Sequence, residues 1–368
     1  MCRIRKFAVC FVLTLALAGC VANGALKSVA ARSDLQSPVI ANGTLQDAPY
    51  RIDIPNHWNR DLVVLMHGYQ PKGTPRRDPW PQDENAPVFL KRGYAVAASA
   101  YSGQGWAVAE GMADSERLRQ YFVSKYGQPR HTYAVGFSLG GHLALATLEQ
   151  HSKQYDGALS WCGVNVPAEE IFGEGILTPL VALEYFFPKA IPLAAGGLAD
   201  PKSPPMLDRD TIEATLKTDE AKASILEKRL QLPRTMPSGA MVLDYMVLRE
   251  MQQRAGGFPV DNMKTIYSGF GDDAAFNRGV RRYTGLPAAM AYVKRNFELT
   301  GRIEKPVVLQ SNAIDQTVPA RFAARYPELV RLAGQSKKLT VLPPVGEGHC
   351  DFTDKQIGDA FDVLVKHQ

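Results

Sequence analysis

The sequence is poor in cysteine, and its few cysteines do not form a metal-binding pattern. Of the five cysteines in 368 residues, Cys2, Cys10 and Cys20 lie at the N-terminus, which leaves Cys162 and Cys350 for the rest of the chain. No Cys/His cluster has the spacing of metal ligands. We therefore expect no metal and no other cofactor.

Clustered basic charge is also lacking. The formal net charge is +5 at pH 7, but residues 1–19 hold three basic and no acidic residues, which leaves +2 for the remainder. No run of Lys and Arg occurs, and basic residues do not alternate with aromatic ones. This charge describes a mildly basic solvated surface and excludes a nucleic-acid-binding protein.

The apolar segment near the N-terminus is too short to cross a membrane. It covers residues 7–17 and follows Arg3, Arg5 and Lys6, whereas a spanning helix needs about 20 residues. Small residues and Cys20 come next, so residues 1–19 are predicted to be a signal peptide. The sequence Leu-Ala-Gly-Cys resembles the lipobox of bacterial lipoproteins, which implies lipid on Cys20.

The lipoprotein resemblance predicts an exported protein whose only contact with the membrane is its N-terminal lipid. Val21 stands where an aspartate would indicate retention in the inner membrane, so the outer membrane is favoured. An ordinary signal peptide with an incidental cysteine is the alternative. Residues 20–48 are rich in Ala, Ser, Asn and Gly and are predicted to be a flexible tether.

The segment around Ser138 organises the rest of the chain. An apolar run that ends at Val135 predicts a buried strand, and a helix-forming run begins just after Gly141. Between them, Gly136, Ser138 and Gly140 have G-x-S-x-G spacing, in which glycines flank a strained turn and allow strand and helix to pack closely. This pattern predicts a nucleophile elbow that exposes the serine hydroxyl at a helix N-terminus.

These residues resemble the α/β-hydrolase superfamily, and the resemblance extends from about residue 50 to the C-terminus, interrupted by one insertion. It implies a mostly parallel central sheet flanked by helices, with core segments 49–164 and 302–368. It also implies serine, acid and histidine in that order along the chain. The turn His67-Gly68-Tyr69 follows an apolar strand, so the resemblance assigns the oxyanion hole to the amides of Tyr69 and Leu139.

Asp315 and His349 take the places that the superfamily gives to the acid and the base. Asp315 follows the predicted strand at residues 305–310, and His349 follows the last predicted strand at residues 338–342. Two aspartates in the insertion, Asp272 and Asp273, are the alternative acids. His142 is expected to pack beneath the site rather than to act in it.

Residues 165–301 predict helices rather than strands and match the lid of lidded α/β-hydrolases. Helical patterns cover residues 177–187, 210–230, 239–254 and 286–300, separated by Pro- and Gly-rich breaks. Most of the aromatic and Met residues on these helices are expected to form the core of the lid. Tyr101 and Trp106, on a loop at the carboxyl end of the sheet, are candidate pocket walls, or they pin that loop.

The resemblance implies a serine hydrolase that acts on a small, apolar or aromatic carboxylic ester through an acyl-enzyme on Ser138. A peptidase or amidase of the same fold and a noncatalytic hydrolase-like binding protein are the alternatives. A dehalogenase of the usual form is excluded, because it needs an aspartate in place of Ser138. The sequence does not indicate an oligomeric state.

The superfamily's sheet order also implies a position for the two remaining cysteines. The strand that ends near Cys162 adjoins the nucleophile strand, and the loop that carries His349 and Cys350 leans back towards Ser138. A disulfide between Cys162 and Cys350 is therefore expected, as for a leftover pair in an exported protein. Two free buried cysteines remain the alternative.

Overall fold

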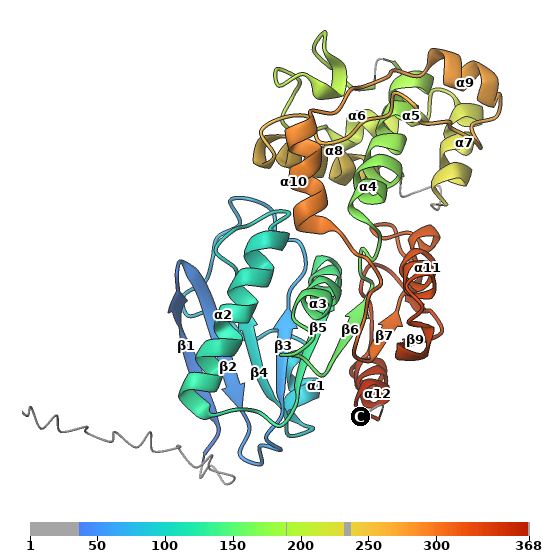
Figure 1. Cartoon of the computed structure of the whole chain (residues 1–368). Coiled ribbons are helices and arrows are strands. Elements are labelled where there is room, and N and C mark those ends of the chain that lie inside the picture. Colours follow the sequence, from blue (N-terminus) through green and yellow to red (C-terminus); the bar gives the residue numbers. More distant parts are fainter. Residues whose placement is uncertain (1–36, 189, 232–236, 367–368) are drawn as a thin grey trace, which may run out of the picture.

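The computed structural model describes residues 37–188, 190–231 and 237–366, which contain an eight-stranded central sheet (Figure 1). The strand order is β1-β2-β4-β3-β5-β6-β7-β9. The bounds are β1 Val39–Leu45, β2 Ala48–Ile54, β3 Leu62–Met66, β4 Ala95–Ser99, β5 Thr132–Phe137, β6 Gly157–Trp161, β7 Val307–Gln310 and β9 Leu339–Val341. The predicted signal peptide and Cys20 lie outside the described residues.

The sheet contains both antiparallel and parallel strand pairs. The hairpin β1–β2 and the pair β2–β4 are antiparallel, whereas every pair from β4 to β9 is parallel. The parallel strands β3, β4 and β6 are buried at every position, because helices cover both faces of a parallel sheet. Their continuous apolar runs follow from this double burial.

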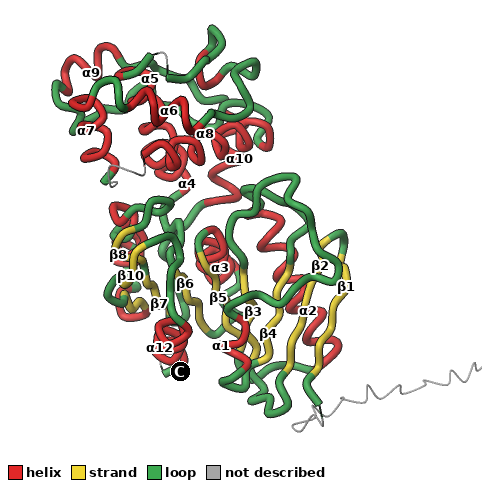
Figure 2. The backbone as a smooth tube through the Cα atoms, turned by 180° about the vertical axis from the view of Figure 1, so that it is seen from behind, coloured by secondary structure: helices red, strands yellow, loops and turns green. Residues whose placement is uncertain are grey.

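Helices pack on both faces of the sheet and create two apolar cores (Figures 1 and 2). One core lies against α1 (Ala86–Leu90) and α12 (Asp354–Val365). The other lies against α2 (Val108–Tyr126), α3 (Leu139–Gln150) and α11 (Arg325–Leu332). The expected fold class, a mostly parallel sheet flanked by helices, is confirmed.

Between β6 and β7 the chain forms a helical insertion, residues 168–297, which sits beyond the carboxyl ends of the parallel strands (Figure 1). None of the described helices is long and apolar enough to cross a membrane. The described residues of the insertion contain a π-helix, a 3-10 helix and seven α-helices: α4 Ala168–Glu170, η1 Ile171–Leu177, α5 Thr178–Phe186, η2 Gly197–Ala199, α6 Arg209–Leu216, α7 Glu220–Leu230, α8 Pro237–Arg254, α9 Asp273–Gly279 and α10 Pro287–Phe297.

Two expected segments differ from the structure. The single helix expected over residues 210–230 is two helices, because the Asp219 side chain accepts a hydrogen bond from the Lys222 amide and so starts α7 as an N-cap. The tether expected over residues 20–48 contains β1, which pairs with β2 along its whole length. No residue of β1 is buried, so this edge strand lacks the apolar–polar alternation that marks a half-buried strand in a sequence.

A second, two-stranded parallel sheet was not expected. It pairs β8 (Asn312–Ile314) with β10 (Val345–Glu347). Both strands are only three residues long, and each is followed directly by a loop. The pairing therefore brings the segment that follows β7 beside the segment that follows β9.

Candidate active site

Ser138 occupies a strained turn between β5 and α3. Its φ and ψ are 56° and −124°, a conformation that L-residues adopt rarely. A Cβ on Gly136 would lie 2.1 Å from the Gly140 carbonyl oxygen, and one on Gly140 would lie 2.0 Å from the Met66 carbonyl oxygen. The close packing of strand, turn and helix therefore requires glycine on both sides of Ser138.

His349 connects Ser138 with Asp315 through two short hydrogen bonds. The Ser138 hydroxyl lies 2.7 Å from His349 Nε2, and His349 Nδ1 lies 2.8 Å from Asp315 Oδ2. Because a carboxylate only accepts, Nδ1 carries the hydrogen and Nε2 accepts from the serine hydroxyl. The structure thus brings together the three residues that the sequence singled out, from three different loops.

Backbone amides fix the Asp315 carboxylate. Its Oδ1 accepts hydrogen bonds from the amides of Thr317 at 2.7 Å and Val318 at 2.9 Å, which leaves Oδ2 for the imidazole. Asp315 is 5% exposed. The alternative acids, both in the insertion, accept instead from other backbone amides: Asp272 from that of Ala275 in α9, and Asp273 from that of Phe270 just before α9.

A buried asparagine that the sequence analysis missed holds the His349 loop. Asn312, 2% exposed, accepts a hydrogen bond from the Cys350 amide at 3.0 Å. Its side-chain amide donates to the carbonyls of Val345 at 3.1 Å and Asp351 at 3.0 Å. Asn312 lies three positions before Asp315 in the sequence, so one short segment positions both the acid and the loop of the base.

The loop of His349 is also tied to the sheet by a covalent bond. Cys162, which follows β6, forms a disulfide with Cys350, and their Cα atoms are 5.3 Å apart. The expected disulfide is confirmed. The Cys350 sulfur lies 3.5 Å from His349 Nε2, so the bond directly adjoins the imidazole.

The two amides expected as an oxyanion hole lie beside Ser138. Tyr69 and Leu139 line the same pocket as Ser138, and a Cβ on Gly68 would come within 3.2 Å of the Ser138 Cβ. Within the described part of the chain, neither the Tyr69 amide nor the Leu139 amide donates to another backbone group. Both remain available to an oxygen held at Ser138.

Four features together identify the fold: the order of the strands, the antiparallel β2, the turn at Ser138, and the loops that carry Asp315 and His349. The chain has the α/β-hydrolase fold. No protein-family model and no curated protein matches the sequence.

Three solved structures illustrate how distant the similar proteins are. E-2-(acetamidomethylene)succinate hydrolase has 14% identity and a TM-score of 0.43 over 89% of this chain and 99% of its own. A membrane phospholipase A described as a bacterial virulence factor has 15% and 0.43 over 90% and 86%. A puromycin hydrolase has 15% and 0.45 over 90% of this chain but only 38% of its own. The reaction therefore has to be argued from the site of this α/β-hydrolase fold itself.

Two other histidines near Ser138, His67 and His142, pack within the fold. Tyr101 stacks on the His67 ring at 4.0 Å and donates to the His67 carbonyl at 3.1 Å. His142 Nδ1 lies 2.8 Å from the Val164 carbonyl. Burial lowers the pKa of each imidazole to about 4, so both are neutral at pH 7. Tyr101, a candidate pocket wall, instead supports the loop of His67.

The pocket at Ser138 lies between the α/β-hydrolase core and the insertion. Trp106, the other candidate wall, does line it, together with aromatic and aliphatic side chains from both parts. Within the described ranges, no group of three or more His, Cys, Asp or Glu could hold a metal ion. The lining residues are Tyr69, Trp106, Ser138, Leu139, Val164, Val166, Ile171, Gly175, Ile176, Leu243, Asp244, Val247, Thr317 and Phe322.

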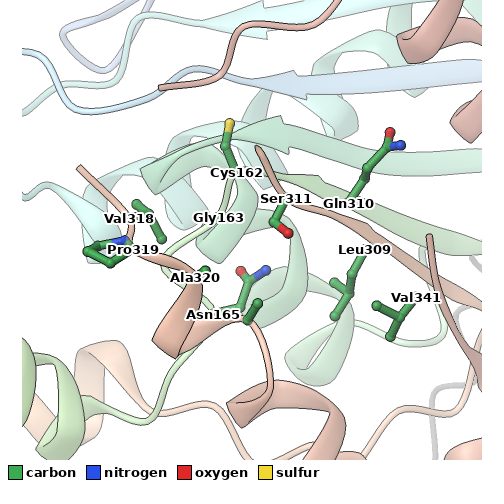
Figure 3. Close-up of a pocket in the computed structure, with 11 residues that line it drawn as sticks. Cys162, Gly163, Asn165, Leu309, Gln310, Ser311, Val318, Pro319, Ala320 and Val341 are labelled. Atoms are coloured by element: carbon green, nitrogen blue, oxygen red, sulfur yellow. The ribbon is translucent and has the colours of Figure 1, made fainter. Parts of the chain in front are cut away.

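A second cavity lies beside the disulfide but does not include Ser138. Figure 3 shows Cys162 on its wall, with residues from the ends of β6 and β7 and from the segment after Asp315. Its lining offers no acid, base or cation to a ligand: Cys162, Gly163, Asn165, Leu309, Gln310, Ser311, Val318, Pro319, Ala320, Ala323 and Val341. The pocket at Ser138 is therefore the candidate active site.

Helix α8 and the π-helix η1 supply the wall of the pocket from the insertion. One face of α8, with Met241, Tyr245 and Met251, is fully buried in the insertion, as expected for lid core. Leu243, Asp244 and Val247 of the same helix line the pocket. The sequence analysis missed Asp244 because a single acid within a helical pattern normally marks the solvated face.

The carboxylate of Glu250 joins α8 to the core loops beside Ser138. It accepts hydrogen bonds from the Trp106 amide at 2.8 Å, the Tyr69 hydroxyl at 3.1 Å and Arg254 Nε at 2.6 Å. Arg254 also pairs with Glu110 of α2 at 2.7 Å. Burial and the neighbouring Glu250 charge raise the pKa of Tyr69, so its hydroxyl remains a donor. Through Glu250, the insertion therefore holds Tyr69, whose backbone amide is one of the two expected in the oxyanion hole.

Proposed function

We propose that this protein is a serine hydrolase that cleaves carboxylic esters through an acyl-enzyme on Ser138. The observation that carries the proposal is the chain of hydrogen bonds from the Ser138 hydroxyl through His349 to the buried Asp315 carboxylate. Its occurrence at a strained turn before a helix N-terminus matches what acyl transfer requires.

The proposed reaction has two balanced steps. Ser138 Oγ attacks the ester carbonyl while its proton passes to His349 Nε2, and the amides of Tyr69 and Leu139 stabilise the oxyanion. The imidazolium then protonates the departing alcohol. In the second step, water loses a proton to His349 and attacks the acyl carbonyl, and the imidazolium returns the proton to Ser138 Oγ as the carboxylic acid leaves. Asp315 stabilises the imidazolium in both steps.

Esters are proposed rather than amides because an alcohol leaves with less assistance from a proton than an amine does. The test is hydrolysis of p-nitrophenyl esters from acetyl to palmitoyl and of feruloyl esters, compared with aminoacyl amides, with Ser138→Ala as the control. A faster reaction with amides would replace the ester proposal by a peptidase. A failure of Ser138 to react with a fluorophosphonate probe would indicate a noncatalytic binding protein.

We further propose that the protein is exported and anchored by lipid on Cys20, on the periplasmic or outer face of a bacterial membrane. The Cys162–Cys350 disulfide supports export, since such bonds persist in oxidising compartments. Replacement of Cys20 by Ser is expected to abolish incorporation of labelled lipid and to release the protein from membranes. An unchanged membrane fraction would contradict the anchor.

A further inference from the structure

Asp244 is the one carboxylate among the residues that line the pocket at Ser138. It lies on α8 between Leu243 and the next turn, which contributes Val247 to the same wall. The rest of the pocket is made almost entirely of aliphatic and aromatic side chains. An acid therefore stands in surroundings that an apolar residue would fill at lower cost.

Asp244 is half-buried, and within the described part of the chain its carboxyl has no hydrogen-bond donor, so a substrate that displaces water from the pocket would have to supply one. Among the described residues, the charged group that affects the Asp244 carboxyl is the guanidinium of Arg321, on the 3-10 helix η3 (Ala320–Phe322). That guanidinium donates to the Leu230 carbonyl and lies 4.6 Å from the centre of the Phe322 ring. Arg321 thus already contacts the end of α7 and an aromatic ring, and its Nε is buried without a hydrogen-bond partner among the described residues.

The surroundings also determine the protonation state of the Asp244 carboxyl. Burial raises the pKa of Asp244 to about 8, an effect that the positive charge of Arg321 partly offsets. A carboxyl that keeps its proton at pH 7 both donates and accepts hydrogen bonds. A neutral hydroxyl group of a substrate also donates and accepts, so it can pair with this carboxyl in both ways. A cationic group of a substrate would instead be repelled by the positive charge of the neighbouring Arg321.

We propose that Asp244 is a specificity-determining residue that hydrogen-bonds a hydroxyl group on the acyl chain of the substrate. The enzyme is thus selective for esters of hydroxylated, otherwise apolar acids. This inference rests on the proposed ester hydrolysis at Ser138. The acyl group is assigned to this pocket because it stays bonded to Ser138 in the acyl-enzyme while the alcohol leaves, and Ser138 opens directly onto Asp244's pocket.

The test uses p-nitrophenyl esters of hexanoic, octanoic and decanoic acids that carry hydrogen, hydroxyl or ammonium on the last carbon. At the chain length that reaches Asp244, kcat/KM of the hydroxyl ester is expected to exceed that of the unsubstituted ester by about 10-fold or more. Asp244→Leu is expected to reverse this preference. Asp244→Asn, whose amide still donates and accepts, is expected to keep part of it. Asp210→Asn, an exposed acid on α6, is the matched control and is expected to change nothing.

Two outcomes would overturn the role of Asp244. One is equal hydrolysis of hydroxyl and unsubstituted esters at every length, or a hydroxyl preference that survives in Asp244→Leu. The other is a preference for the ammonium esters that both Asp244 variants lose, which would mean recognition of charge. Failure to hydrolyse any of the nine esters would instead count against the proposed function, and the inference would fall with it.

Discussion

Cys162 and Cys350 are 188 residues apart in the sequence, and their disulfide fastens the loop of His349 to the end of β6. Since β6 pairs with β5, which leads directly into Ser138, the bond connects the loop of the base to the strand next to the nucleophile. The His349 imidazole and the Ser138 hydroxyl are thereby both held by the same part of the sheet.

Removal of the disulfide is expected to lower both stability and activity. Closure of so long a loop stabilises a fold by about 2–4 kcal/mol, so the Cys162→Ala/Cys350→Ala variant should unfold at lower temperature. Loss of the tether should also reduce kcat, because His349 adjoins Cys350. Thermal unfolding and ester kinetics with and without a thiol reductant measure both effects. The double variant, which has no bond to reduce, is the control and should not respond to reductant.

Thiol titration tests the bond itself. The denatured, unreduced domain without Cys20 is expected to have no free thiol, and reduction should expose two. Two thiols before reduction would show that the cysteines are unpaired.

Variants of the proposed triad should lose activity without losing the fold. Ser138→Ala, His349→Ala and Asp315→Asn are each expected to reduce kcat by about 10⁴-fold or more. The effects should not add in double variants, because the three residues act on one proton. Ester kinetics combined with circular dichroism would check this. Near-normal turnover in Asp315→Asn would contradict the assignment of the acid.

The sequence was sufficient to predict the residues whose place is determined by local pattern. Ser138 lies between a buried strand and a helix, and the glycines beside it report a steric requirement that any sequence with this turn must meet. Asp315 and His349 could be predicted because each follows a strand of the resembled sheet. The disulfide followed from the same order of strands.

Contacts that depend on the packing of the insertion could not be predicted in this way. Asp244 and Glu250 lie on a helix whose apolar residues also serve the insertion's own core, so periodicity alone does not show which polar residues face inward. Asn312 belongs to a three-residue strand, too short for alternation to mark it. In each case a tertiary contact decides the role.

Glu250 is expected to act as a positioning residue for the oxyanion loop. Glu250→Gln keeps the shape of the side chain but removes the charge that pairs with Arg254, and we expect kcat to fall by about 10-fold with a smaller change in KM. Tyr69→Phe, which keeps the backbone amide, should have a weaker effect, and the two substitutions should not be additive, because the Tyr69 hydroxyl bonds Glu250.

Glu213→Gln provides the matched control for this experiment, since Glu213 pairs with Lys217 on the outside of α6. It should leave the kinetics unchanged. A purely structural role of Glu250 would lower the unfolding temperature while kcat of the folded enzyme stayed normal, and that result would contradict the positioning role.

The stability of the protein is expected to depend on pH through Asp244. The pKa of its carboxyl is about 8 in the folded protein, above the value of about 4 for an unfolded chain. Between these values the folded state holds a proton that the unfolded state has released, so stability falls as pH rises through this window. Asp244→Asn cannot release that proton and should be more stable than the wild type at pH 8, by about 1–3 kcal/mol after allowance for its partial exposure.

Below pH 4 the carboxyl is protonated in both states, so the advantage of Asp244→Asn should disappear. Chemical denaturation at pH 4, 6 and 8 would measure the trend, with Asp210→Asn as the exposed control, whose difference from the wild type should stay near zero. A constant difference between Asp244→Asn and the wild type at all three values would show that Asp244 is ionised in the folded protein. The neutral acid that the selection of a substrate hydroxyl requires would then be absent, because an ionised carboxylate can only accept hydrogen bonds.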